Sequence, residues 1–204
     1  MKLIFATNNQ HKIDEVKTVL PGHFEILTLK EAGIDIDIPE PHDTLEENAK
    51  EKAITIYHIT DTACFSEDTG LEVFSLDGEP GVHSARYAGE EKSFDKNIDK
   101  LLANLKDKED KTAQFRAVIC VIIEGNIDFF EGICKGRIMA ERKGSEGFGY
   151  DPVFIPDGAD KTFAEMGMEE KSIYSHRRKA VDKLVSFLNQ SGQKNNIEHK
   201  QPII

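Results

Sequence analysis

The spacing of apolar and polar residues divides the first part of the chain into strands and helices. Residues 2–6 form a short apolar run, residues 7–9 are polar, and apolar residues then recur at helical spacing over 13–20. This order predicts a strand, a tight turn and a helix with an asparagine at its N-cap. Residues 24–29 predict a second strand, and residues 34–41 form an acidic loop that prolines interrupt.

A helix and two further strands are predicted next. Residues 44–47 have the capping-box sequence Thr-Leu-Glu-Glu, which predicts a helix that runs to about residue 58. Residues 62–66 and 71–76 then predict two strands. Between them, the sequence Glu-Asp-Thr-Gly predicts a turn at residues 67–70.

The middle of the chain predicts a helix followed by a long hairpin. A loop at residues 78–89 leads into an amphipathic helix over 94–105, and a charged connection at 106–111 follows. Residues 114–123 and 127–134 flank the sequence Glu-Gly-Asn, which is typical of a β-hairpin.

Shorter elements and a final helix are predicted for the rest of the chain. Residues 137–141 predict one more strand, a glycine-rich loop follows at 144–149, and residues 152–155 are short and extended. Ser175 is the expected N-cap of the last helix. The apolar periodicity ends near residue 192. We therefore expect one folded domain over residues 1–190 and a polar tail that frays over residues 191–204.

The order of these elements predicts the fold class. Strands and helices alternate irregularly, with hairpins in the middle, which is typical of an α/β fold with a mixed β-sheet and flanking helices. The 204 residues are enough for one compact domain, or two closely joined lobes, with a sizeable core.

The charge balance narrows the range of partners. Lys and Arg number 26 and Asp and Glu number 37, so the net charge is −11. Long-range repulsion opposes binding to nucleic acid or to an anionic membrane, although a local basic pocket can still hold a small polyanion. No apolar run approaches the roughly 20 residues that span a bilayer. The N-terminus becomes polar too early for a signal peptide.

Three cysteines indicate the compartment. Cys64, Cys120 and Cys134 are odd in number, lack CxxC spacing and lie in or beside apolar segments. Reduced thiols in the core explain this pattern best, so we expect a cytoplasmic protein.

The segment after the first strand is a candidate phosphate site. It consists of Thr7, Asn8, Asn9, Gln10, His11 and Lys12. The start of a helix presents unpaired N–H groups and the positive end of the helix dipole, and Lys12 adds a cation in the first turn. The alternative is an ordinary capped helix with a solvent-exposed lysine.

A second lysine falls on an apolar stripe. Lys52 shares one face of its predicted helix with Leu45, Ala49 and Ile56. Its ammonium group either reaches solvent at the edge of the helix or points into a polar cleft, and the sequence leaves both possibilities open.

Three carboxylates are candidates for metal binding or base catalysis. Glu67 and Asp68 are adjacent at a predicted strand end, and Glu40 precedes Pro41 in the acidic loop. Mg²⁺ suits such a set, because it takes few carboxylates together with water and phosphate oxygens. One carboxylate can instead act as a general base. An exposed acidic turn is the alternative for Glu67 and Asp68.

Cationic residues gather before and within the first turn of the last helix. Lys171, His176 and Arg177 are among them, and the helix dipole disfavours positive charge at that end. A polyanion or a carbonyl-bearing ligand would offset this charge, and a solvated basic patch is the alternative. The loop at 147–152 holds two aromatic residues in a glycine frame, which is suited to stacking on a planar base or to filling a gap in the core.

Five motifs together resemble one family. They are TNNQHK at 7–12, EDTGL at 67–71, PGVHSARY at 80–87, GFGYDP at 147–152 and EK…SHR at 170–177. In order and spacing they are similar to the motifs of the inosine triphosphate pyrophosphatases, the non-canonical purine nucleoside triphosphate pyrophosphatase family. The resemblance covers about residues 1–190. Glu-Asp-Thr at 67–69 stands where many bacterial members have Asp-Asp-Ser, and this keeps charge and hydroxyl.

The resemblance implies a function and a shape. It implies magnesium-dependent hydrolysis of ITP, dITP and XTP to the monophosphate and pyrophosphate, in a protein with two lobes around a central substrate cleft that is usually a homodimer. Asp68 is then the proton acceptor and a metal ligand, and Glu40 and Glu67 are further metal ligands. The implied substrate-binding residues are Thr7, Asn8, Asn9, Gln10, His11, Lys12, Lys52, Thr69, Phe148, Gly149, Tyr150, Asp151, Lys171, His176 and Arg177.

Two rival functions use similar residues. A regulatory module that binds nucleotide without turnover would have little use for three nearby acids. A pyrophosphatase for modified pyrimidines would share the architecture, but the Ser-His-Arg motif favours purines. Hypoxanthine and xanthine carry a 6-oxo acceptor that donors from His176, Arg177 or the backbone can meet, whereas the 6-amino group of adenine would face those donors.

Overall fold

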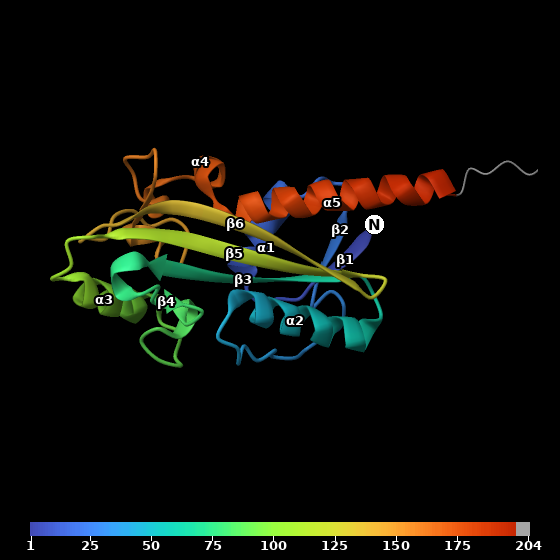
Figure 1. Ribbon diagram of the computed structural model, residues 1–204, viewed down its shortest axis with the longest axis horizontal. Coiled ribbons are helices and arrows are strands. Elements are labelled where there is room, and N and C mark those ends of the chain that lie inside the picture. Colours follow the sequence, from blue (N-terminus) through green and yellow to red (C-terminus); the bar gives the residue numbers. More distant parts are fainter. Residues whose placement is uncertain (199–204) are drawn as a thin grey trace, which may run out of the picture.

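One mixed sheet forms the centre of the computed structural model, which describes the backbone of residues 1–198 and the side chains of residues 1–190 (Figure 1). Neighbouring strands run in the order β2-β1-β3-β5-β6-β7, and β4 pairs with β3. β1 is parallel to β2 and β3, and the other pairs are antiparallel. The strands are β1 (Lys2–Phe5), β2 (Glu25–Thr28), β3 (Cys64–Val73), β4 (Pro80–Gly81), β5 (Thr112–Ile123), β6 (Asn126–Ile138) and β7 (Phe154–Pro156). The expected mixed α/β sheet is confirmed.

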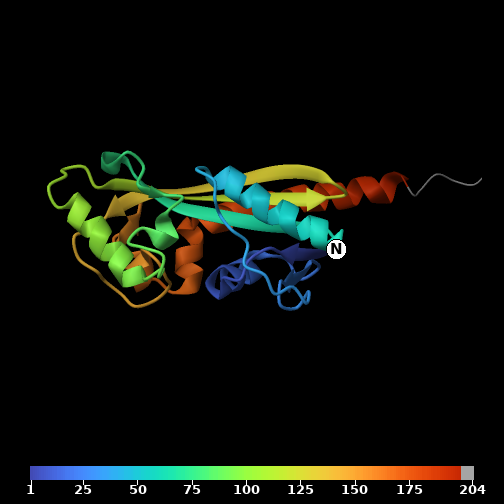
Figure 2. The same cartoon turned by 90° about the horizontal axis from the view of Figure 1, so that it is seen from below.

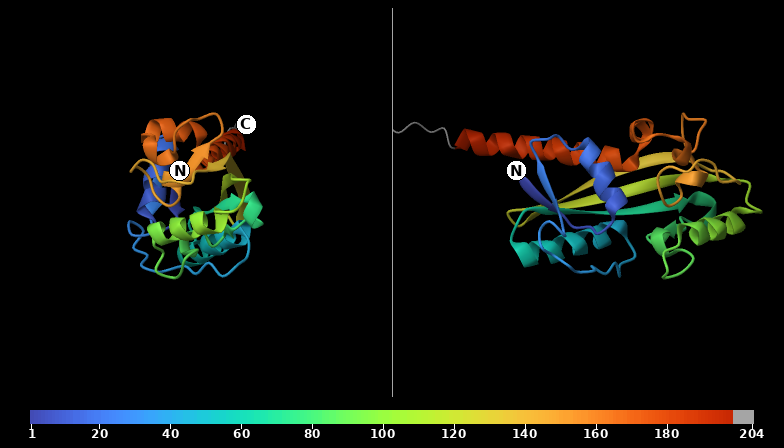
Figure 3. Two further views of the ribbon diagram at one scale, coloured as in Figure 1. Left: turned by 90° about the vertical axis from the view of Figure 1, so that its left-hand side faces the viewer. Right: turned by 180° about the vertical axis from the view of Figure 1, so that it is seen from behind.

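Helices cover both faces of this sheet. Figure 1 shows α5 on one side of the central strands and α2 on the other, and Figure 3 shows α1 beside α5. The α-helices are α1 (Gln10–Val19), α2 (Leu45–Thr60), α3 (Phe94–Leu105), α4 (Met168–Tyr174) and α5 (His176–Glu198). Within the described residues, none of the helices has an apolar stretch long enough to cross a bilayer.

Side-chain caps fix where the helices begin. Asn9 and Thr44 accept backbone hydrogen bonds from the first turns of α1 and α2, as the sequence predicts. Ser175 Oγ accepts a hydrogen bond from the N–H of Arg178 (3.2 Å), which confirms it as the cap of α5. The backbone of α5 continues to Glu198, past the expected loss of periodicity at residue 192. The remaining part of the expected tail, residues 199–204, lies outside the described residues.

The predicted turn at residues 67–70 is wrong. β3 crosses this segment without a break, because all ten of its residues pair with β5. The glycine serves packing instead of a turn: a Cβ atom on Gly70 would lie 2.5 Å from the carbonyl oxygen of Gly81 in β4. Glu67, Asp68 and Thr69 therefore lie in the middle of a central strand, on alternating faces.

The separate strand predicted at residues 137–141 is also wrong. Arg137 and Ile138 are the last residues of β6, and residues 139–141 are not in a strand. The end of β6 pairs with β7, and Gly136 permits this because a Cβ atom there would lie 2.2 Å from the carbonyl oxygen of Ile155. The extended segment predicted at 152–155 begins as a 3₁₀ turn, η3 (Asp151–Val153), and becomes a strand only at Phe154.

The apolar core divides the molecule into two lobes. In the first lobe, one cluster lies between the sheet, α1 and α5, and another lies between the sheet and α2. In the second lobe, a third cluster joins α3 to the far ends of β3, β5 and β6 and to the segment that contains β7. Figure 2 shows α2 and α3 at opposite ends of the sheet, with the chain between them crossing the junction of the lobes.

Candidate active site

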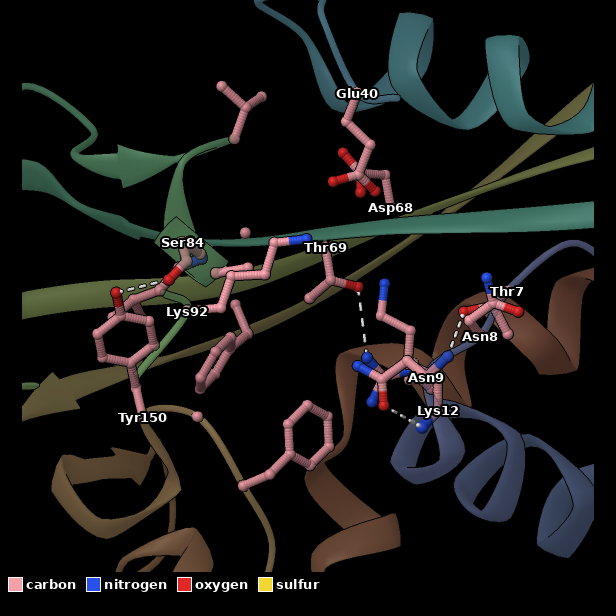
Figure 4. A pocket seen from close by; sticks show the side chains of 18 of the residues that line it. Thr7, Asn8, Asn9, Lys12, Glu40, Asp68, Thr69, Ser84, Lys92 and Tyr150 are labelled. Carbon is pink, nitrogen blue, oxygen red and sulfur yellow. Dashed lines mark hydrogen bonds between the residues drawn. The ribbon is translucent and has the colours of Figure 1, made fainter. Parts of the chain in front are cut away.

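A cavity of about 260 Å³ lies where the two lobes meet. The first lobe contributes the residues that follow β1, together with Lys52 of α2 and Asp68 of β3. The second lobe contributes Ser84, Tyr150 and the loop before α3, and Figure 4 shows these side chains around the same space. The cavity occupies the position of the substrate cleft that the family resemblance implies.

The turn between β1 and α1 forms one wall of the cavity. Thr7 Oγ1 accepts a hydrogen bond from the N–H of Asn9 (3.2 Å), and Asn9 Oδ1 accepts one from the N–H of Lys12 (3.3 Å). Asn8 Nδ2 donates to the carbonyl of Ile36 (2.9 Å), which fixes the turn to the acidic loop. These bonds orient the start of α1 towards the cavity, as a phosphate-binding role requires.

The two remaining residues of this predicted segment point elsewhere. Gln10 Nε2 donates to Asp14 Oδ1 (2.7 Å) on the exposed side of α1. The ring of His11 stacks on Phe148, with ring centroids 4.8 Å apart and planes 13° from parallel. Neither is among the described residues that line the cavity.

Lys12 and Lys52 both point into the molecule. Lys52 Nζ lies 2.6 Å from Glu40 Oε1 and 2.9 Å from Asp68 Oδ1. It also donates to the carbonyl of Glu67 at 3.0 Å, and Lys12 Nζ donates to the same oxygen at 3.3 Å. Burial lowers the pKa of Lys12. Burial also disfavours the charged form of Lys52, but the nearby Asp68 and Glu40 hold the pKa of Lys52 above its usual value. An exposed Lys12 and a Lys52 that reaches solvent are thus both excluded.

Glu40 and Asp68 form a carboxylate pair around a cation. Burial raises the pKa of Asp68, against the attraction of Lys52. Burial also opposes ionisation of Glu40, but Lys52 holds the pKa of that carboxyl below its usual range. Arg86 Nη2 donates to the carbonyl of Glu40 (3.0 Å) and fixes its position from the second lobe. The ammonium of Lys52 lies between two carboxylate oxygens, and a pair of carboxylates is a suitable set of ligands for Mg²⁺.

Glu67 lies on the other face of β3, away from this pair. Its carboxylate accepts two hydrogen bonds from Arg177, at 2.9 Å from Nε and 3.2 Å from Nη2, and it lies 3.6 Å from Lys12 Nζ. Burial alone would raise the pKa of Glu67, but Arg177 and Lys12 lower it to about 2. The structure thus separates Glu67 from Glu40 and Asp68, and the described residues contain no cluster of three potential His, Cys, Asp or Glu metal ligands.

The glycine-rich loop forms the opposite end of the cavity. Asp151 Oδ2 accepts hydrogen bonds from the N–H of Phe148 (2.9 Å) and from Lys171 Nζ (2.6 Å). Gly147 has φ +73°, and a Cβ atom there would lie 2.0 Å from that carboxylate, so this fold of the loop requires glycine. Tyr150 donates to the carbonyl of Ser84 (2.9 Å) and joins the loop to the PGVHSARY segment.

His176 is a residue of the cavity wall whose ring nitrogens lack partners in the described part of the chain. The side chain is buried on the cavity wall, stacked on Phe115 with centroids 4.8 Å apart, and neither ring nitrogen has a hydrogen-bond partner among the described residues. Burial and the nearby Arg177 lower its pKa to about 3, so the ring is neutral at pH 7. A neutral imidazole has one donor and one acceptor, and contacts within the described residues use neither of them.

Arg177, in contrast, is largely occupied within the protein. Besides Glu67 it pairs with Glu15 of α1, and its Nη2 lies 3.4 Å from Thr69 Oγ1. Burial opposes its charge, yet Glu67 and Glu15 raise its pKa. The charge of Arg177 at the start of α5 is therefore balanced by carboxylates of the protein itself.

Glu15 is a site residue that the sequence analysis misses. Its carboxylate also lies 2.8 Å from Lys171 Nζ, so it joins two of the predicted substrate-binding residues. Burial opposes its ionisation, but Arg177 and Lys171 lower its pKa to about 2. The available signal was its position three residues after Lys12, on the same side of α1.

The charged groups of the site nearly cancel one another. Among the described residues, five cations pair with five carboxylates, and each cation lies within 4.0 Å of at least one of them. The cations are Lys12, Lys52, Arg86, Lys171 and Arg177, and the carboxylates are Glu15, Glu40, Glu67, Asp68 and Asp151. A polyanionic ligand therefore requires further positive charge.

Comparison with known proteins places this chain in a family. A model of the Ham1 family matches residues 3–187. A dITP/XTP pyrophosphatase of Porphyromonas gingivalis is 52% identical over 188 residues, which are 92% of this chain and 97% of that protein. A dITP/XTP pyrophosphatase of Christiangramia forsetii is 49% identical over 92% of this chain and 99% of that protein. The structure of the Staphylococcus aureus Ham1 protein superimposes with a TM-score of 0.85 at 40% identity, over 94% of this chain and 100% of that one. With this family match, these relatives and this fold in agreement, the chain belongs to the Ham1 family.

Proposed function

We propose that this protein hydrolyses ITP, dITP and XTP to the nucleoside monophosphate and pyrophosphate, and so removes damaged purines from the nucleotide pool. The observation that carries the proposal is one cavity that joins a wall suited to phosphate to a wall suited to a base. Lys12, Lys52 and the start of α1 make the first wall, and the unpartnered His176 belongs to the second. The relatives named above support the substrate class, because they carry this activity in their names.

The phosphate wall provides the groups that hydrolysis needs. In the proposed complex the triphosphate lies along residues 7–12, where backbone N–H groups and the two lysines offset its charge. Asp68 accepts a proton from the water that attacks the α-phosphorus, and pyrophosphate leaves. Lys52, held by Glu40 and Asp68, orients the carboxylate of Asp68.

Glu40 and Asp68 are the residues that would hold Mg²⁺. Their oxygens already bracket one cation, Lys52, and the near cancellation of charge around the cavity supports a need for additional positive charge. Bound Mg²⁺ would neutralise phosphate oxygens and the leaving pyrophosphate. Glu67 remains a predicted metal ligand, but its contacts fit a role in positioning Arg177 and Lys12.

The base wall accounts for selectivity between oxo and amino purines. Phe148 offers an aromatic face, and neutral His176 can donate a hydrogen bond to the 6-oxo oxygen of hypoxanthine or xanthine. Adenine presents an amino donor at that position and would leave a buried donor unpaired, which costs about 1–3 kcal/mol. Because Arg177 is bound by Glu67 and Glu15, His176 is better placed than Arg177 to read the base.

The expected homodimer and cytoplasmic location complete the proposal. Cys64, Cys120 and Cys134 are buried and unpaired, and this supports a reducing compartment. Light scattering coupled to size-exclusion chromatography tests the homodimer, since one chain has a mass of 22.9 kDa.

A substrate panel with product identification tests the activity. We expect Mg²⁺-dependent release of pyrophosphate and IMP from ITP, with catalytic efficiency at least tenfold higher than for ATP. Asp68→Asn is nearly isosteric and should lower kcat by more than tenfold while the protein remains folded by circular dichroism. Release of orthophosphate and IDP, or binding of ITP without turnover, would contradict the proposal, and the second result would favour the regulatory module.

A further inference from the structure

Lys92 is a cation of the cavity wall that has no partner within the described part of the chain. It lies in the loop between η2 (Ser84–Arg86) and α3, and it lines the cavity. Its side chain forms no ion pair and no hydrogen bond with any described residue. The four other cations of the cavity wall, by contrast, are each bound by a carboxylate.

The position of Lys92 places this free charge opposite the phosphate wall. Figure 4 shows its side chain extending from the Ser84 side of the cavity in the direction of Thr69, whereas Asn9 and Lys12 enter from α1. Phe94, two residues later, also lines the cavity and contacts the Phe148 ring, with centroids 6.1 Å apart. The first residue of α3, directly after the loop that carries Lys92, is therefore in contact with the base wall.

The backbone at Lys92 is unusual for a lysine. Its φ is +51°, in the left-handed region that residues other than Gly, Asn and Asp seldom adopt. The N–H of Lys92 donates to the carbonyl of Gly89 (3.3 Å), so the loop closes on itself and presents this side chain at its end. Residues in such conformations gather at ligand-binding sites.

We propose that Lys92 binds the pyrophosphate portion of the substrate from the second lobe. The inference rests on the proposed function, because it names a further residue for the same ligand. An unpaired ammonium group beside a network whose cations and carboxylates cancel one another supplies the positive charge that a polyphosphate requires. The triphosphate would then be held between the start of α1 in one lobe and Lys92 in the other.

Direct binding of inorganic pyrophosphate tests this inference. We compare wild type with Lys92→Gln, which removes the charge and keeps a flexible polar side chain one atom shorter, by calorimetry with pyrophosphate and Mg²⁺ and by steady-state kinetics with ITP. We expect the Kd for pyrophosphate and the KM for ITP to rise about three- to tenfold, with kcat changed less than twofold. The difference should shrink as salt is raised, because Lys92 is exposed and its charge is screened.

Lys96→Gln is the matched control. Lys96 lies four residues later, is exposed, and pairs with Glu91 at 2.7 Å outside the cavity, so this variant changes the net charge equally. Equal effects of the two variants would overturn the inference. So would a Lys92→Gln variant that weakens the binding of IMP and leaves that of pyrophosphate unchanged, because Lys92 would then contact the nucleoside. If wild type binds pyrophosphate but releases none from ITP, the proposed function fails while the binding comparison still decides the role of Lys92.

Discussion

At the scale of single residues, Glu15 holds two cations of the site in place. Its carboxylate contacts Lys171 and Arg177, which lie on α4 and α5, although Glu15 itself belongs to α1. A buried ion pair of this kind gains little over an apolar contact, but removal of one partner leaves an uncompensated charge in the interior. Glu15 therefore fixes the geometry of residues that face the ligand without reaching the ligand itself.

Replacement of Glu15 by glutamine should lower stability in a pH-dependent way. The pKa of Glu15 is depressed from 4.5 to about 2 in the folded protein, so its contribution is fully present above about pH 4.5 and is lost as the pH falls towards 2. A shift of this size corresponds to roughly 3 kcal/mol. Urea unfolding should show that the unfolding free energy of Glu15→Gln is lower than that of wild type by about this amount at pH 7. The difference should become smaller below pH 4.5.

The surface pair of Glu25 and Lys2 provides the control for this experiment. Both side chains are more than half exposed and lie 3.7 Å apart, so Glu25→Gln should change the unfolding free energy by about 0.5 kcal/mol or less. If the difference in unfolding free energy between wild type and Glu15→Gln stayed constant between pH 7 and pH 3, the lost stability would arise from packing and not from charge.

At the scale of elements, local patterns predict most helices and strands but fail in β3, where charged site residues break the apolar pattern of the strand. Amphipathic spacing and caps suffice for α1 and α2, and amphipathic spacing alone suffices for α3, because each helix buries one face in the apolar core. In β3 the charged residues Glu67 and Asp68 occupy the interior of a central strand, which a sequence pattern assigns to a turn. Their partners Arg177 and Lys52 lie 110 and 16 residues away, so only the tertiary fold shows what stabilises them.

Gly132 of β6 shows how one element positions another. A Cβ atom on Gly132 would lie 2.0 Å from the carbonyl oxygen of His176, at the start of α5. Gly132→Ala should therefore displace the first turn of α5, lower the unfolding free energy by about 1–3 kcal/mol and lower kcat/KM for ITP. Gly22→Ala is the control, because no atom lies within 4 Å of its added Cβ. Equal stability and activity of the two variants would show that α5 can move without consequence.

At the scale of the whole molecule, the site lies where the two lobes meet, and its cationic and acidic side chains largely neutralise one another. Sequence patterns predict Lys12, Lys52, Asp68 and the start of α5 as site residues, and the structure brings them to one cavity. They do not predict Glu15 or Lys92, because neither has a distinctive sequence context. The contact between Glu15 and Arg177 joins residues 162 positions apart, and the position of Lys92 depends on how the second lobe packs against the first.

This internal neutralisation predicts that metal is needed for turnover but not for folding. Lys52 offsets the charges of Glu40 and Asp68 in the structure, so EDTA should abolish hydrolysis of ITP while the Tm changes by less than about 2 °C.

Lys52→Gln removes that compensation and should lower stability by about 3 kcal/mol, or roughly 6–12 °C in Tm for a chain of this size. Mg²⁺ should then raise the Tm of Lys52→Gln by more than that of wild type, because the two carboxylates gain a cation that they otherwise lack. Lys50→Gln, at an exposed position of the same helix, is the control and should respond to Mg²⁺ like wild type. A wild-type Tm that falls sharply in EDTA would show that Lys52 does not neutralise the pair, and the same conclusion would follow from a Lys52→Gln variant that is indifferent to Mg²⁺.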